Sequence, residues 1–516
     1  MIRSEGILAD RVILMARGCT WRMAIHLVER ETRAAKPIRV AIFVGLVCGF
    51  WFFVANPSRA SQLPSYGEQD VLPSPCATDP DFREFEKLQA DAYQTDKALD
   101  FRIVLSPDFQ DDVAKKTINV LRDRSHERNM VYPVTPGILR DLQAEMTHIK
   151  TPTCYENRAY YYLIRHIAYD ATLASFEIGL PLEEPPKFGS LPSNDINAYT
   201  YLTRRGQGRI IAINAQLFNF ISKMTKLAAS GVDLRMGREM DSEARIVVEG
   251  LLDISYNQNA KDAFVNSVLG LLRGRPIAKI PVEPSKEAFV AFFEGAMERF
   301  VFAHEYGHII KHHVSPKIFI PMGATGNEEH EVLARTWKQE FEADVIGSQL
   351  LIQLLRGGGA DNPDARSYYA FGMKSPLFFF ECMELLDRAR FILENRTMPP
   401  VLSEEDKALV RSCADRTMSP AASRCAVEVL GTHPPAWLRR ERLEKVIKDT
   451  LAQQPNRKVT ALAAQKADEM IFSIDLFWRA TSRQLLEQIV KQANGNLGRP
   501  CADNGAGRGP MRAPIS

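Results

Sequence analysis

The segment that most constrains this chain is Phe302–His313, which reads FAHEYGHIIKHH. It contains the pattern His-Glu-x-x-His, formed by His304, Glu305 and His308. Residues four apart lie on one face of a helix, so the two histidines would present their rings side by side. That spacing suits two nitrogen ligands on one zinc ion, and the glutamate, one step round the helix, can reach a metal-activated water.

The alternative is an ordinary amphipathic helix with surface histidines. The flanking sequence argues against it, because AMERFVFA before the pattern and Ile309-Ile310 after it are apolar enough for a buried helix. Polar side chains in such a helix need partners, since burying them unpaired is costly. We therefore expect one long helix over residues 286–313. His312 follows His308 by four residues, but three ligands in line on a straight helix cannot surround one ion, so we do not expect it to bind.

A second helical segment, 337–355, supplies a third ligand. Its sequence WKQEFEADVIGSQLLIQLL places Glu340 and Asp344 four residues apart and therefore on one face. Ala343 and Gly347 are small, which would let this helix approach the first closely. We expect Glu340 to bind the metal, and Asp344 to accept a hydrogen bond from the other ring nitrogen of a ligand histidine. The alternative is that these acidic residues form a solvated face.

With this pair of motifs, the chain resembles a known family. HEYGH followed by EFEAD is similar to the gluzincin metallopeptidases of the CAAX prenyl endopeptidase type, including their bacterial membrane and periplasmic relatives. Thr432-His433-Pro434-Pro435, followed by Arg439, is similar to the THPP…R segment of that family. Asn197-Ala198-Tyr199 and the β-rich run Arg209–Phe218 resemble its strand before the metal helix. The resemblance covers about residues 197–443.

The resemblance implies a zinc endopeptidase. We expect an α+β fold, predominantly α-helical, with a gluzincin-like core and a small sheet edge beside the HExxH helix. The ligands of one zinc ion per chain would be His304, His308 and Glu340. Glu305 would be the general base, and Asp344 would orient a ligand histidine. His433 would lie near the cleft and steady the oxyanion or gate the metal, although its segment also fits a capped helix that starts with proline.

The chain also departs from that family. Residues 231–284 separate the predicted strand from the metal helix and form an insert that could shape or cover the cleft. Arg440 stands where an apolar residue is usual, and the multi-pass membrane core of the best-known members is absent, so prenyl-protein processing does not carry over. Phage-exclusion-type proteases with a similar core are a rival within the same chemistry. A non-catalytic alternative is a membrane-tethered envelope assembly or chaperone factor with a structural or closed metal site, in which His433 would be the fourth ligand.

The partner of such a site would be a protein or peptide substrate. An open edge of the strand at Arg209–Phe218 could pair with an extended peptide through main-chain hydrogen bonds. A plain internal strand is equally consistent with that run. The chain has 516 residues, of which 45% are hydrophobic and 25% charged, and a net charge of +2. This composition suits a large globular core and argues against nucleic acid as a partner.

The N-terminal part predicts delivery to a membrane. Residues 1–39 are arginine-rich, and the run 40–55 carries no charge. A spanning helix needs about 20 residues, so this run is short but within reach of an anchor, with the N-terminus inside. A cleaved signal peptide and a buried soluble helix are the alternatives. We expect a single-pass protein of the bacterial cell membrane with an extracytoplasmic (periplasmic) peptidase domain, or a protein secreted to the periplasm after signal cleavage.

The remaining segments complete the expected organisation. Residues 56–80, rich in Pro and Ser, indicate a linker, and 81–456 the metallopeptidase domain. Residues 457–493 predict a C-terminal helix and 494–516 a disordered tail. Within the domain, Pro399–Ala421 indicates a loop.

The cysteines give no metal site of their own. Of the eight cysteines, none forms a CxxC pair. Cys413 and Cys425 bracket a short polar segment and could be bridged in an oxidising compartment, or could remain free thiols.

Overall fold

The computed structural model describes residues 75–95, 140, 143–146, 148–193, 195–203, 208–232, 258–273, 280–313, 326–356, 369–415, 434–452 and 457–497. Several predictions lie outside these residues: those for 1–39 and 40–55, for most of the linker and tail, and for His433 and a Cys413–Cys425 bridge. Among the residues that the structure describes, no helix is long and apolar enough to cross a membrane.

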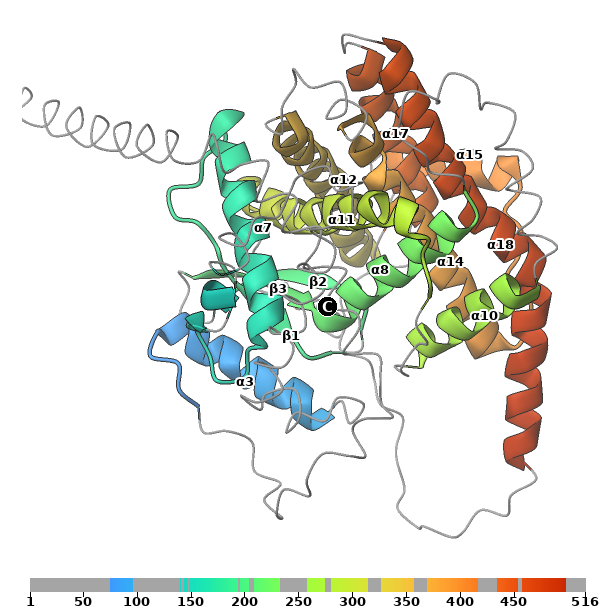
Figure 1. The fold of residues 1–516 in the computed structure, drawn as a ribbon, viewed down its shortest axis with the longest axis horizontal. Coiled ribbons are helices and arrows are strands. Elements are labelled where there is room, and N and C mark those ends of the chain that lie inside the picture. The colour runs from blue at the N-terminus through green and yellow to red at the C-terminus, as the bar shows by residue number, and fades with distance from the viewer. Residues whose placement is uncertain are drawn as a thin grey trace, which may run out of the picture.

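The helix α11 (Pro284–Ile310) runs through the middle of the fold (Figure 1). Every residue from 293 to 307 is buried, including the charged Glu294, Glu298 and Arg299. Four helices pack against it: α7 (Arg158–Glu177), α8 (Ala215–Ser230), α12 (Gly326–Arg356) and α14 (Ser375–Asn395). The helix that carries the histidine pair is therefore enclosed by other elements over most of its length.

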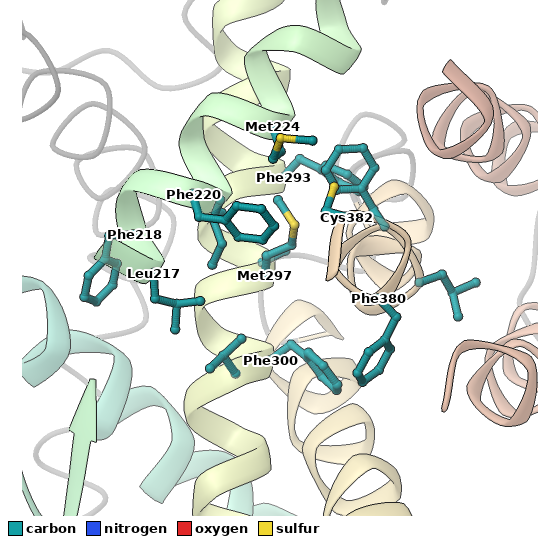
Figure 2. Packing of buried hydrophobic residues seen from close by; sticks show 14 of the residues in the cluster. Leu217, Phe218, Phe220, Met224, Phe293, Met297, Phe300, Phe380 and Cys382 are labelled. Atoms are coloured by element: carbon teal, nitrogen blue, oxygen red, sulfur yellow. The ribbon is translucent and has the colours of Figure 1, made fainter. Parts of the chain in front are cut away.

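Aromatic side chains pack α11 against its neighbours over the turns that precede the histidines (Figure 2). Phe293 and Phe300 lie against α14, and the rings of Phe300 and Phe380 meet edge to face with centroids 5.8 Å apart. Phe220 and Met224 of α8 contribute to the same core cluster. This packing fixes the position of α11 along its axis relative to α8 and α14. It thereby also fixes where His304 and His308 lie.

A small mixed sheet lies beside α11. Its strands β1 (Lys187–Leu191), β2 (Ala198–Leu202) and β3 (Arg209–Asn214) are arranged in the order β1-β3-β2. β3 pairs parallel with β1 and antiparallel with β2, so it is the internal strand. The expectation of an open edge on the strand at 209–218 is therefore wrong, and the internal alternative is correct. The edge strand that packs on α11 is β2.

The described chain starts with a segment tied to this sheet. A disulfide joins Cys76 to Cys154, just ahead of α3 (Pro80–Thr95). The buried Glu86 of α3 accepts backbone hydrogen bonds from both cysteines, at 3.0 Å each. Phe85 packs on two residues of β3. The last residues of the predicted linker are thus attached to the folded domain.

Removing this disulfide is expected to destabilise the fold. The bridge closes a loop with a sequence separation of 78, and such a cross-link typically contributes about 2–4 kcal/mol. The double variant Cys76→Ser/Cys154→Ser should lose that amount in urea unfolding under non-reducing conditions. Wild type treated with dithiothreitol should lose the same amount, whereas the variant should not respond to it. An equal response of both proteins to the reductant would contradict the assignment.

The C-terminal half completes the helical core. α10 (Gln258–Leu272), a helix of the insert, packs against α8, α14 and α18 (Arg457–Leu497). Phe264 of α10 stacks on Phe477 of α18 with ring centroids 5.1 Å apart. The C-terminal helix therefore belongs to the same core and extends beyond residue 493. The prediction of a mostly helical α+β fold with a small sheet is confirmed.

The prediction of a loop over Pro399–Ala421 is wrong in the middle of that range, where the structure has a helix. α15 spans Glu404–Asp415 and is followed, after residues that the structure does not describe, by α17 (Ala436–Ala452). Ser403 and Asp406 cap the start of α15 reciprocally: the serine hydroxyl accepts the Asp406 N–H at 3.1 Å, and the aspartate accepts the Ser403 N–H at 3.0 Å. This capping box satisfies backbone donors that a loop would leave to solvent.

Candidate metal centre

Close contact between α11 and α12 brings the two sequence motifs together. A Cβ atom added at Gly347 would lie 2.9 Å from the backbone nitrogen of His304. One added at Gly307 would lie 3.1 Å from the carbonyl oxygen of Ala343. Each glycine therefore lets the other helix approach its backbone, as the small residues of the second motif predict. Larger side chains at these positions would push Glu340 away from the histidines.

The side chains of the three predicted ligands come together. His304 Nε2 and His308 Nε2 lie 3.2 Å apart. Glu340 Oε2 lies 3.4 Å from the first, and Glu340 Oε1 lies 3.6 Å from the second. A tetrahedral zinc ion with bonds of about 2.0–2.1 Å separates its ligand atoms by roughly 3.3 Å. The arrangement of His304, His308 and Glu340 fits a single ion of that size.

Asp344 occupies the position that the sequence predicts. Its Oδ1 lies 2.9 Å from His304 Nδ1, so it accepts the proton of that nitrogen and leaves Nε2 for a metal. Asp344 is only 1% exposed, and Arg439 of α17 neutralises it. The guanidinium donates from Nε to Oδ2 at 2.8 Å and from Nη2 to Oδ1 at 2.6 Å. Arg439 Nη1 also lies 3.1 Å from Glu340 Oε2, so one arginine holds both carboxylates.

These contacts set the protonation states of the metal-free site. Burial opposes the charge on His304, but hydrogen bonds to Asp344 and Glu340 outweigh it and raise the pKa of His304 to about 9. Burial and the neighbouring His304 lower the pKa of His308 to about 3. Burial also opposes the charges of Asp344 and Arg439, but their mutual attraction outweighs it, lowering the pKa of Asp344 and raising that of Arg439. A cation that binds here therefore finds His308 neutral and displaces one proton from His304.

Glu305 lies beside the ligand set and is held by the sheet. Thr200 of β2 donates its hydroxyl proton to Glu305 Oε2 at 2.8 Å. Glu305 is 8% exposed, and burial raises the pKa of its carboxyl above the usual value, against the opposing effects of His304 and Thr200. A carboxylate oriented by one hydrogen bond, with a raised pKa, is a stronger base than an ordinary carboxylate and is suited to take up and release a proton.

Two of these contacts were not predicted from the sequence. Arg439 was noted only as a match to a motif, without a partner, and its ion pairs depend on how α17 packs on α12. Thr200 follows Asn197-Ala198-Tyr199 directly, but nothing local distinguishes it from other threonines in strands. Arg440, which departs from the family pattern, pairs with the buried Glu381 of α14, and this ion pair accounts for a charge at an otherwise apolar position.

His433 is the one predicted site residue that the structure does not describe. The described chain resumes at Pro434, and α17 begins two residues later. A search of protein-family models, of curated proteins and of solved structures finds no match for this chain. The likeness to gluzincin peptidases therefore depends on the motifs of this sequence alone.

Proposed function

We propose that this protein is a zinc-dependent endopeptidase that hydrolyses peptide bonds of protein substrates. The observation that carries the proposal is the proximity of three side chains: the Nε2 atoms of His304 and His308 lie 3.2 Å apart, and each lies 3.4 or 3.6 Å from a carboxylate oxygen of Glu340. Glu305 lies beside them. Three protein ligands are the number found in catalytic zinc sites, where the fourth position is left for water or substrate. We also propose that the core of the fold is gluzincin-like.

The proposed mechanism assigns one task to each side chain. Zinc bound by the three ligands would supply Lewis acidity, lowering the pKa of a water molecule and polarising the peptide carbonyl. Thr200 occupies Glu305 Oε2, which leaves Oε1 to take a proton from the attacking water and return it to the leaving amide nitrogen. Asp344 keeps His304 in the tautomer that binds through Nε2. His433 stays a candidate for steadying the oxyanion.

The substrate would lie along β2. This strand pairs with β3 on one side only among the described residues, and its Thr200 contacts the proposed base. An extended peptide that adds to the free side through main-chain hydrogen bonds would bring a carbonyl towards the metal centre with little dependence on side chains. Such recognition suits a protease that acts on unfolded or extended segments.

The disulfide supports the proposed location. Cys76–Cys154 lies soon after the apolar run at 40–55, and disulfides persist in oxidising compartments such as the bacterial periplasm. We therefore propose that the peptidase domain acts outside the cytoplasm, anchored by or released from the N-terminal segment.

Metal removal tests the proposed function. The full chain, purified in detergent, should hold one zinc per chain by elemental analysis and should cleave casein or a proteome-derived peptide mixture. Dialysis against a chelator should abolish cleavage, and stoichiometric zinc should restore it. A protein without zinc, or with activity that survives zinc removal, would refute the proposal. A protein that holds zinc but cleaves nothing would favour the non-catalytic alternative.

A further inference from the structure

The end of α11 places an additional histidine next to the proposed metal centre. The helix ends at Ile310, earlier than the predicted 313, and His312 adopts a left-handed backbone with a φ of 54°. The chain turns back there, and the backbone N–H of His313 bonds to the carbonyl of His308 at 2.9 Å. The ring of His313 thereby lies beside the ring of His308, with centroids 5.3 Å apart.

Two contacts join His313 to its surroundings. Its Nδ1 lies 3.2 Å from His308 Nδ1, and its Nε2 lies 2.9 Å from Glu342 Oε2. The His313 side chain is 8% exposed, and that of Glu342 is 38% exposed. Glu342 follows Glu340 by two residues on α12, so its side chain leaves the helix on a different face. The series His308–His313–Glu342 therefore runs from the metal centre outwards.

The chemistry of imidazole fixes the direction of these hydrogen bonds. A neutral imidazole has one N–H and one lone pair. If His308 binds a metal through Nε2, its Nδ1 carries the proton and donates it to His313 Nδ1. His313 must then carry its own proton on Nε2, where Glu342 accepts it. Read from the outside, Glu342 keeps the proton of His313 on Nε2, which leaves His313 Nδ1 as an acceptor. That acceptor favours the tautomer of His308 with its proton on Nδ1 and its Nε2 free.

We infer that His313 and Glu342 are positioning residues for His308, and that they help to set the zinc affinity of the site; this rests on the proposed zinc site. Asp344 orients His304 in the same way, by accepting the proton of its Nδ1 directly. The two ligand histidines are thus oriented by different means: one by a buried carboxylate, the other by a second imidazole. Outer partners of ligand histidines typically contribute 10- to 100-fold in metal affinity.

Competition with a chromophoric chelator, starting from metal-free protein, measures the zinc dissociation constant directly. His313→Leu should weaken zinc binding about 10- to 100-fold, because His308 Nδ1 loses its acceptor. His313→Gln should recover much of this loss, since its amide oxygen can accept from His308 and its amide nitrogen can donate to Glu342. Equal weakening by Leu and Gln would show that only packing matters and would overturn the inference.

Glu342 provides a second variant at a half-exposed position, where loss of folding is a smaller risk. Glu342→Ala should weaken zinc binding in the same direction. The double variant with His313→Leu should bind zinc no more weakly than His313→Leu alone, because the two residues act on His308 in series. Additive losses would contradict this coupling.

His312→Asn is the matched control. His312 is exposed, and asparagine tolerates the left-handed backbone that this position requires. Its zinc affinity should equal that of wild type, and a loss as large as that of His313→Leu would overturn the inference. A failure of the proposed function looks different. In that case wild type itself would bind no zinc, or His304→Ala would leave the zinc affinity unchanged.

Discussion

Glu305→Gln is expected to keep one zinc per chain while lowering the rate of peptide hydrolysis by about 10²- to 10⁴-fold, the usual contribution of a general base. The amide has the size of the carboxyl and can still accept the hydrogen bond from Thr200. It cannot take a proton from the attacking water. Steady-state cleavage of a fluorogenic peptide and elemental analysis of the same sample provide the two readouts.

The matched control for this variant is Glu394→Gln, the same change at an exposed residue near the end of α14. It should leave both the zinc content and the cleavage rate unchanged. Hydrolysis by Glu305→Gln at the wild-type rate would remove Glu305 from the mechanism. Loss of zinc from Glu305→Gln would indicate that this residue supports the ligands instead.

Arg439→Met is expected to lower the free energy of unfolding of the metal-free protein by about 3–5 kcal/mol, the usual cost of breaking a buried ion pair from one side. The substitution leaves Asp344 and Glu340, which are 1% and 8% exposed, without their guanidinium partner. In the zinc-loaded protein the same substitution should lower the free energy of unfolding by less, because the zinc ion neutralises Glu340. Urea unfolding with chelator and with zinc distinguishes the two cases.

Two further variants sharpen this test. Arg439→Lys keeps the charge but cannot match the fork of donors that binds both carboxylates, so we expect an intermediate loss. Arg442→Met removes an arginine of the same helix, whose guanidinium carbon lies 3.8 Å from the ring centroid of Phe341. It should lower the free energy of unfolding by clearly less than Arg439→Met does. If Arg439→Met and Arg442→Met were equally mild, the buried ion network would not contribute to folding as we argue.

The parts of the site that follow from helical periodicity could be predicted from the sequence. The spacing of His304 and His308 and that of Glu340 and Asp344 each require only that the segment be helical. The small residues opposite them then allow the two helices to meet. These predictions agree with the structure because every contact involved lies between two long and strongly patterned segments.

Other parts depend on information that the sequence does not hold locally. An apolar β-rich run such as Arg209–Phe218 suits an edge or an internal strand equally, and its place is set by β1 and β2. His313 meets His308 only because the helix ends three residues earlier than its pattern suggests. By contrast, the start of α15 carried a readable signal, since Ser403 and Asp406 have the spacing of a capping box.

The packing of α18 has a practical consequence for anyone who wishes to isolate a minimal active fragment. Residue 456 is the boundary that the sequence suggests, yet α18 beyond it covers apolar faces of α8, α10 and α14. A protein truncated there would expose Phe264 and the residues around it to water, and exposed patches of that kind promote aggregation. The smallest fragment worth expressing therefore extends to Leu497.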